Sequence, residues 1–366
     1  MKVFFRITIL LLNIAAAIGL LVVYIGLYVS PAHFWYLALP GLVYPILLFI
    51  NLLFILFWLF TKKKALLLIS LLMIVVRFDL VLSFIHLPYQ PRNLPDDSFK
   101  IMSYNVKNFG LYSWENNTLI RDQIFNLIKE EAPDIICMQE FFHSKDNKFI
   151  NLDSILNNSK QKNHHLTPTT IYKYQFWGIA IFTQYPIISK GKLTFKETTN
   201  SIIWVDLKKD DKTIRVYNCH LQSFKMHEDY LKKMDDIPQN KQDLKTYKNI
   251  LRQLKKGYEA RSIQADSLSA HIKTCPYPYF VCGDFNDTPF SYTYNTIKNE
   301  NNLNDSYKTA GTNMSGTYVG NLPSFRIDYI LYSNDFKAFN QKVITRKLSD
   351  HYPISCSFVL NETAKK

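Results

Sequence analysis

The stretch VCGDFNDTPF (residues 281–290) joins an apolar run to a cluster of polar side chains. Its first residues are typical of a buried strand, whereas Asp284, Asn286 and Asp287 follow where that strand should end. Side chains at the end of a buried strand are held more rigidly than side chains on a long loop. The stretch therefore predicts a fixed polar cluster at the edge of a sheet, where other polar residues should meet it.

The same arrangement, a polar residue beside an apolar strand-like run, recurs through the chain. Apart from the opening cluster, the residues concerned are Asn105 in KIMSYN, Glu140 in DIICMQE, His220 in RVYNCH, and Asp350 with His351 before YPISCSF. Taken singly, each has a plainer explanation: an Asx-turn for Asn105, a helix cap for Glu140, a hydrogen-bonded core position for His220. Their common context favours a single cleft that they share.

The residue types in this set suit phosphate chemistry. Oxygen ligands such as Asn105 and Glu140 fit a hard divalent cation, and Mg²⁺ typically takes one or two carboxylates together with water and substrate phosphate. Two histidines would hydrogen-bond or protonate phosphoryl oxygens. A buried aspartate beside a metal and a phosphate would orient or deprotonate an attacking water.

The fold class predicted for the region after residue 99 is α/β. Short β-type runs alternate with helical patterns, the clearest at 117–131 and 241–273, and KKDDK reads as a hairpin turn between two runs. We expect one two-sheet α/β sandwich with helices outside and mixed strand directions. The region after residue 99 carries 36 Lys and Arg against 27 Asp and Glu, and this net charge of +9 suits a phosphate-bearing partner or an inert solvated surface equally well. Four of the five cysteines lie in or beside apolar runs, which predicts no disulfide framework.

The N-terminal quarter is strongly apolar. Residues 1–87 are predicted to be a membrane anchor with three transmembrane helices at about 7–29, 34–60 and 65–87. Lys and Arg precede the first span and separate the second from the third, while SPAH between the first two carries neither. By the positive-inside rule, the N-terminus lies in the cytoplasm and the rest of the chain outside it. Residues 88–99 read as a Pro-rich linker to the domain at 100–366.

The third segment is the weakest of the three because it contains Arg77 and Asp79. A charge near the centre of a span costs about 2.5–3.5 kcal/mol on insertion scales. Two residues two apart do not face each other on a helix. We expect the helix to end near Leu82 with Arg77 reaching the outer interface, and an intramembrane functional pair is the alternative.

Seven segments together resemble the endonuclease/exonuclease/phosphatase superfamily. They are SYNVKNF, DIICMQE, GIAIFTQYPI, YNCHLQS, CGDFNDTPFSYTY, FRIDYIL and SDHYPI, and they follow one another in family order between residues 100 and 359. The superfamily includes deoxyribonucleases, AP endonucleases, deadenylases, inositol-polyphosphate 5-phosphatases and neutral sphingomyelinases. The pairing of Gly-Asp-x-Asn with a distant Ser-Asp-His-x-Pro is specific, so the resemblance implies the superfamily's sandwich fold and hydrolysis of phosphate esters.

The resemblance also implies a role for each matching residue. Glu140 would be the principal ligand of Mg²⁺, with Mn²⁺ as a possible substitute, and Asn105 would assist it. Asp284 would activate the attacking water, and Asn286 would position the phosphate. His220 and His351 would contact the phosphate, with His351 held by Asp350. Asp328 would orient a histidine or help to bind metal, and Asp287 would only belong to the turn.

The branch of the superfamily is less clear. NCHLQ is similar to the form found in deoxyribonucleases, deadenylases and sphingomyelinases, and the inositol-phosphatase pattern is absent. The resemblance implies an Mg²⁺-dependent phosphodiesterase of nuclease or phospholipid-headgroup type, and the predicted spans would anchor it at the outer side of a bacterial plasma membrane. A phosphomonoesterase and a non-catalytic, membrane-tethered binding module remain as alternatives. The expected partners are the substrate and the lipid bilayer, and no protein partner is predicted.

Overall fold

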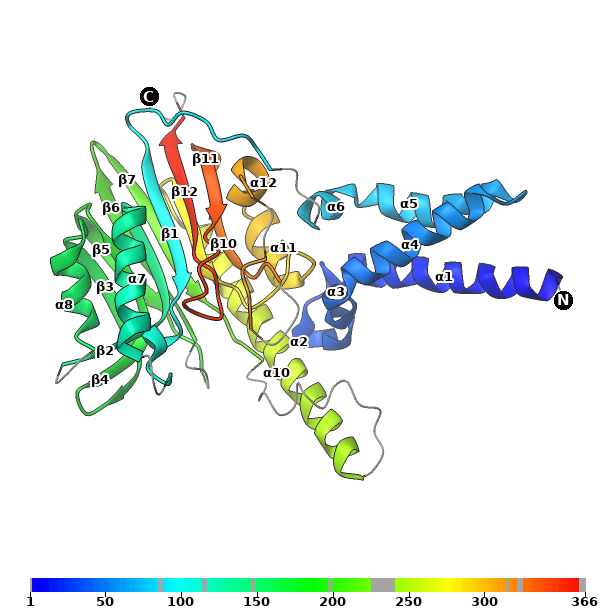
Figure 1. Ribbon diagram of the computed structural model, residues 1–366, viewed down its shortest axis with the longest axis horizontal. Helices are drawn as coiled ribbons and strands as arrows, with labels where there is room; N and C mark the ends of the chain where they lie inside the picture. The colour runs from blue at the N-terminus through cyan, green and yellow to red at the C-terminus, as the bar shows by residue number, and fades with distance from the viewer. Residues whose placement is uncertain are drawn as a thin grey trace.

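The computed structural model describes residues 2–84, 88–113, 117–145, 149–196, 198, 200–224, 241–313, 316–320 and 325–361. These residues form a helical unit, residues 2–84, and a sandwich unit, residues 99–361. Figure 1 shows the helical unit extending away from one side of the sandwich. Residues 88–97 connect the two without regular helix or strand, and hydrogen bonds between Arg92 and Asn340 hold the connection against the sandwich.

Two six-stranded sheets make up the sandwich. The first runs in the order β11 (Phe336–Val343), β12 (Ile354–Leu360), β1 (Phe99–Asn105), β2 (Ile135–Ser144), β4 (Gln175–Thr183), β3 (Asn163–Tyr172). The second runs in the order β5 (Ile187–Leu193), β6 (Ser201–Lys209), β7 (Lys212–His220), β8 (Tyr279–Asp284), β10 (Asp328–Tyr332), β9 (Asn304–Asp305). Strands β1 and β2 are parallel, as are β7 and β8, and the other pairs are antiparallel, which confirms the mixed two-sheet α/β sandwich.

The core lies between the sheets because alternate strand residues point inward from both of them. Ile101 and Ile181 of the first sheet pack against Val205, Val216 and Cys282 of the second. Helices α7 (Asn117–Glu131) and α8 (Asn151–Asn158) cover the outer face of the first sheet. Helices α10 (Lys241–Ile272) and α11 (Tyr292–Asn299) cover the second, and the short η3 (Lys107–Gly110) and α12 (Ser306–Ala310) complete the unit. The helices expected at 117–131 and 241–273 are therefore confirmed.

Three apolar helices form the main body of the helical unit. They are α1 (Lys2–Gly26), α4 (Tyr44–Leu59) and α5 (Leu68–Val76), and short elements join them: α2 (Pro31–Phe34), η1 (Trp35–Ala38), α3 (Leu39–Leu42), η2 (Lys64–Leu67) and α6 (Phe78–Phe84). A polar network ties the main helices together: the Asn13 amide donates to Ser70 Oγ at 2.6 Å, and the Ser70 hydroxyl donates to Asn51 Oδ1 at 2.8 Å. The Trp58 indole N–H donates to Asn13 Oδ1 at 2.8 Å.

The expectation of three uninterrupted spans is not confirmed. Among the described residues, one helix, Phe4–Gly26, is long and apolar enough to cross a membrane. The second expected span is a pair, Pro31–Leu42 and Tyr44–Leu59, bent by 56°. Pro40 and Pro45 lie on either side of the break, and each lacks the N–H that a continuous helix needs.

The third expected span is also interrupted. Its apolar helix covers only Lys64–Val76, Arg77 has non-helical φ and ψ of −127° and 48°, and α6 begins after it. The last three residues of the expected span, 85–87, lie outside the described residues. Because the helix breaks at Arg77, its guanidinium reaches Asp79 with two hydrogen bonds of 2.9 Å. The expectation that these two side chains cannot meet, which assumed an unbroken helix, is therefore wrong.

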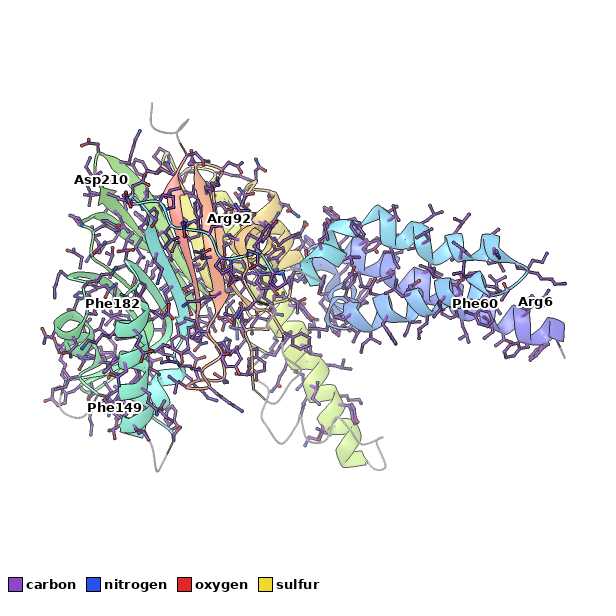
Figure 2. All side chains as sticks on the ribbon, turned by 45° about the horizontal axis from the view of Figure 1, so that its top comes forward. Arg6, Phe60, Arg92, Phe149, Phe182 and Asp210 are labelled. Carbon is purple, nitrogen blue, oxygen red and sulfur yellow. The ribbon has the colours of Figure 1, made fainter. Side chains whose placement is uncertain are left out.

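The helical unit contacts the sandwich unit at Phe290, the last residue of the stretch VCGDFNDTPF. Phe290 belongs to the apolar cluster inside the helical unit, and its ring stacks on Tyr44 with centroids 4.1 Å apart. A Cβ atom added to Gly41 would lie 2.4 Å from the Phe290 carbonyl oxygen, so the two backbones are in close contact. Figure 2 shows Arg6 and Phe60 at the end of the helical unit farther from the sandwich.

Candidate active site

Three polar residues of the second sheet are brought together by strand register. His220 at the end of β7 is paired with Asp284 at the end of β8, and Asp284 is paired with Asp328 at the start of β10. Gly283 makes the close approach possible, because a Cβ there would lie 2.0 Å from a carbonyl oxygen of β7 and its φ is +133°. The predicted convergence of strand ends is confirmed for His220 and Asp284, and Asp328, which was named only through the family resemblance, joins them from the start of β10.

The first sheet supplies Asn105 from the end of β1 and Glu140 from β2. Glu140 has a φ of 49°, and the register of β2 against β4 shifts between Met138 and Phe141. An extra residue in one strand is a β-bulge, a device that re-aims a side chain beside functional sites. The bulge turns Glu140 toward the site, whereas the preceding Gln139 is buried and donates to Asn218 Oδ1 at 2.6 Å between the sheets.

The two sheets meet around Glu140 and Asp284. The Asn105 amide donates to Glu140 Oε1 at 3.2 Å and to Asp284 Oδ2 at 3.1 Å, and its own oxygen accepts from the Lys107 N–H. His220 Nε2 lies 3.8 Å from Glu140 Oε1 and 3.9 Å from Asp284 Oδ2. Residues from β1, β2, β7 and β8 therefore share one site.

His351 joins the cluster from the segment before β12. Its Nε2 lies 3.7 Å from Asp284 Oδ2, and its Nδ1 hydrogen-bonds Asp328 Oδ2 at 2.9 Å. Burial lowers the pKa of His351, but Asp328 and Asp284 outweigh burial and raise that pKa to about 10. An imidazole that Asp328 holds through Nδ1, with Nε2 directed toward Asp284, suits the stabilisation of phosphoryl oxygens.

The expectation that Asp350 holds His351 is wrong. Asp350 Oδ2 pairs instead with Lys107 Nζ at 2.9 Å, and Asp328 takes the histidine. The chain bends at residues 348–350, so Asp350 is directed to Lys107 while its neighbour is directed to Asp328 and Asp284. Burial raises the pKa of Asp350, but His351 and Lys107 outweigh it and lower that pKa overall.

Asp284 lies at the centre of the cluster and is 1% exposed. Burial raises its pKa to about 6, with a further upward contribution from Asp328 and opposing ones from His351 and His220. Asn286, with a φ of 52°, donates its backbone N–H to Asp284 Oδ1 at 2.8 Å and its amide to Asp284 Oδ2 at 3.1 Å. These bonds hold the carboxylate in one orientation, as a group that activates water requires.

A divalent cation has two candidate positions in this cluster, one among Asp284, Asp328 and His351 and the other beside Glu140. Ligand atoms of Asp284, Asp328 and His351 lie within 4.8 Å of one another. In that set, Nδ1 of His351 and Oδ2 of Asp328 are already bonded to each other, so a cation there would have to replace that hydrogen bond. Glu140 fits better, because 35% of its side chain is exposed and a cation beside it keeps the water molecules that Mg²⁺ prefers.

Some residues that support the site were not predicted. Arg261 of α10, fully buried, donates to Asp287 Oδ2 at 3.0 Å and to the Gln222 carbonyl oxygen at 2.8 Å. Asp287 is thus more than a turn residue, because it ties the loop after β8 to α10. Lys107 belongs to the motif SYNVKNF, so the sequence could have identified it as a site residue. Arg261 lies in a long charged helix, and no motif there distinguishes it from its neighbours.

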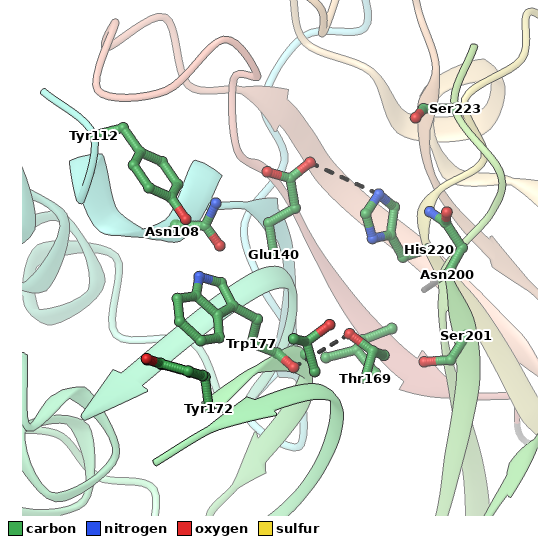
Figure 3. Close-up of a pocket in the computed structure, with 13 residues that line it drawn as sticks. Asn108, Tyr112, Glu140, Thr169, Tyr172, Trp177, Asn200, Ser201, His220 and Ser223 are labelled. Carbon is green, nitrogen blue, oxygen red and sulfur yellow. Dashed lines mark hydrogen bonds and ion pairs between the residues drawn. The ribbon is translucent and has the colours of Figure 1, made fainter. Parts of the chain in front are cut away.

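A cavity of about 490 Å³ opens beside Glu140 and His220 (Figure 3). Tyr112, Tyr172 and Trp177 lie on one side of it in this view. Neutral polar side chains lie on the other side and at its base: Asn200, Ser201, Ser223 and Thr169. The ends of both sheets therefore border a space large enough for a small ligand.

Two histidines, three carboxylates and an amide meet where the two sheets come together, a set of acids, bases and oxygen ligands that suits the hydrolysis of phosphate esters. The sequence profile of the Endonuclease/Exonuclease/phosphatase family matches residues 102–351, and the chain belongs to that family. The profile of a domain of unknown function, DUF8431, matches residues 4–84, which coincides with the helical unit. No curated protein sequence matches the chain significantly.

Solved structures share the sandwich fold. A family member from Bacteroides thetaiotaomicron has a TM-score of 0.53 at 17% identity, over 75% of this chain and 98% of its own. A mannosyl-6-phosphatase from Bacteroides thetaiotaomicron VPI-5482 has a TM-score of 0.52 at 16% identity, over 72% and 100%. The catalytic domain of human Nocturnin, solved with bound sulfate, has a TM-score of 0.51 at 17% identity, over 74% and 97%. Because the sequence identities are only 16–17%, these similarities show that the folds are alike and nothing further.

Proposed function

We propose that the chain is a membrane-anchored, divalent-metal-dependent hydrolase of phosphate esters that acts outside the cytoplasm, in the first place on phosphodiesters. The observation that carries the proposal is the convergence of Glu140, His220 and His351 on the buried carboxylate of Asp284, each within 4 Å of a partner in the cluster. A binding module has no need for this arrangement of acids and bases around one point.

The chain's own residues suggest how the reaction proceeds. Asp284, hydrogen-bonded by Asn286, takes a proton from the attacking water, and its raised pKa makes it a stronger base than an ordinary aspartate. His351 and His220 stabilise the negative charge that develops on the phosphoryl oxygens, and the phosphorus–oxygen bond to the alcohol breaks. Asp328 keeps His351 protonated and correctly turned through its bond to Nδ1.

Mg²⁺ or Mn²⁺, held by Glu140, would withdraw charge from the phosphate when bound. Asn105 would hold the Glu140 carboxylate in place through its amide. To serve as a second ligand, the Asn105 oxygen would first have to leave the Lys107 N–H.

Membrane anchoring is supported by the surface of the helical unit. Its interior contains the Asn13–Ser70–Asn51 network, while its outward side chains are apolar: Phe5, Ile46 and Leu72 are 61%, 60% and 58% exposed. Polar groups that pair inside an apolar exterior are typical of helices packed in lipid. The orientation is supported by Arg6 and by Lys62–Lys64 after Phe60, since Figure 2 places Arg6 and Phe60 at the end away from the sandwich.

A phosphomonoesterase is the second candidate. The cavity beside Glu140 is small, which suits the single alcohol group of a phosphate monoester. One solved structure of the same fold is a mannosyl-6-phosphatase.

The test uses the full chain in nanodiscs with Mg²⁺, Mn²⁺ or EDTA. Bis(p-nitrophenyl) phosphate and p-nitrophenyl phosphate distinguish diesterase from monoesterase, and Asp284→Asn is the matched variant. We expect metal-dependent turnover that the variant loses. Turnover that survives Asp284→Asn would contradict the mechanism, and activity of a cytoplasm-only reporter fused after Lys366 would contradict the orientation.

A further inference from the structure

We infer that the cavity beside Glu140 binds the alcohol part of the substrate, and that this alcohol is a single uncharged ring compound. The substrate would then be a small phosphate ester of a nucleoside or a monosaccharide, and not a nucleic-acid polymer or a phospholipid. The inference rests on the proposed phosphate-ester hydrolysis and adds the substrate class to it.

The position of the cavity is the first step. Glu140 and His220, which flank the place of the reacting phosphate, also belong to the cavity lining, and their side chains lie 3.8 Å apart at its edge (Figure 3). A phosphate beside this pair of side chains has the cavity next to it, where its alcohol group can lie. The described lining thus contacts the part of the substrate that differs from one phosphate ester to another.

The aromatic side of the cavity is the second step. Tyr112 and Tyr172 are 67% and 60% exposed, although burial of such rings is favourable. Trp177 is fixed from behind by Phe142, with ring centroids 4.9 Å apart. Three rings around one small space beside reactive groups provide surfaces on which a flat base, or the C–H face of a sugar, can stack.

The absence of lysine and arginine from the described lining of the cavity is the third step. The chain carries 43 lysines and arginines, yet the described lining of the cavity contains none of them. Among nearby cations, Lys107 is paired with Asp350, and Lys173 lies over the Tyr172 ring at 5.4 Å. Proteins that bind a nucleic-acid backbone neutralise successive phosphates with lysine or arginine, and this lining has no such residue to do so.

The polar residues are the fourth step. Ser201 and Ser223 face the rings across the cavity with hydroxyl groups, which pair with ring nitrogens or sugar hydroxyls, whereas the Asn200 amide is held by Thr198 and the Leu221 carbonyl oxygen. A volume of about 490 Å³ suits one ring system or a linked base and sugar, and not a longer chain.

The experiment compares kcat/KM of the full chain in nanodiscs for small esters with and without a ring. The ringed substrates are a nucleoside 5′-monophosphate, a hexose 6-phosphate and their methyl diesters, and the ringless reference is glycerol 3-phosphate with its methyl diester. We expect Tyr172→Ala to lower the ratio of ringed to ringless kcat/KM about tenfold, as the loss of one stacking surface does. Tyr174→Ala, which removes a 62% exposed tyrosine outside the cavity, should leave the ratio at its parent value.

Each outcome is decisive. The faster turnover of either the nucleoside ester or the hexose ester identifies whether the alcohol of the substrate is a nucleoside or a monosaccharide. Equal effects of Tyr172→Ala on ringed and ringless esters would overturn the inference, as would faster turnover of a single-stranded oligonucleotide or of sphingomyelin vesicles. Absence of metal-dependent turnover with every substrate would instead overturn the proposed function, which the ratio does not test.

Discussion

The ion pair between Arg261 and Asp287 provides the sharpest test of how α10 supports the loop after β8. Both side chains are almost fully buried, and Arg261 Nε lies 3.0 Å from Asp287 Oδ2. Arg261→Met would leave the Asp287 carboxylate buried with only the hydroxyl of Thr293 and its own loop as partners. Breaking a buried pair on one side costs about 3–5 kcal/mol.

A loss of that size should be visible as a lower melting temperature. For a domain of this size, 1 kcal/mol corresponds to about 2–4 °C, so Arg261→Met should lower the melting temperature by about 6–20 °C. The measurement is thermal unfolding of the full chain in detergent, followed by circular dichroism. Lys255→Met on the same helix is the control, because Lys255 is exposed and its contact with Glu259 is long, at 3.6 Å, so the change should stay below about 1 kcal/mol.

The double variant decides between a charge effect and a packing effect. Asp287→Asn keeps an acceptor for Thr293 and removes the charge, so Arg261→Met with Asp287→Asn leaves no unpaired buried ion. We expect the double variant to be more stable than Arg261→Met alone by about 2 kcal/mol. If the two single losses instead add to within about 0.5 kcal/mol, the pair is not coupled and the reasoning is refuted.

Three further changes test the site and its supports. Asp328→Asn removes the charged partner of His351 and should lower kcat about 10- to 100-fold with little change in KM, measured with a chromogenic ester. An equal loss of kcat in Asp350→Asn would contradict the assignment of Asp328 as the residue that holds His351. Phe290→Ala removes the ring that stacks on the helical unit and should cost about 3–5 kcal/mol in thermal unfolding, and an unchanged melting temperature would show that the junction is not a packed core. Gly283→Ala places a Cβ 2.0 Å from the backbone of β7 at a φ of +133°, so we expect little folded protein by size-exclusion chromatography, and normal yield and melting temperature would refute the close approach.

Much of the site was visible in the sequence because its residues lie where strands end. Asn105, His220 and Asp284 each follow an apolar run, and in the structure each occupies the last position of its strand. The helix expected at 117–131 has the observed bounds of α7, since its 3.6-residue apolar period is a local property. Patterns of this kind depend only on neighbours along the chain, and a sequence displays them directly.

The partners of charged residues could not be found in this way. Asp350 is adjacent to His351, yet Asp328, which is 23 residues away, makes the hydrogen bond. Arg77 meets Asp79 only because the helix breaks between α5 and α6. The pairing of charged side chains depends on the direction of the backbone and on distances through space. The apolar periodicity of the sequence gives no information on either.

The sequence by itself determined the sandwich fold, the family, and the residue types gathered at one sheet edge. Only the tertiary structure decided which carboxylate holds His351, that a bulge aims Glu140, and that the loop after Asp284 is secured by Arg261 and by the helical unit. The physical reason is that apolar periodicity is a local property of the chain, whereas the pairing of buried charges is set by strand order, register and helix packing between distant segments.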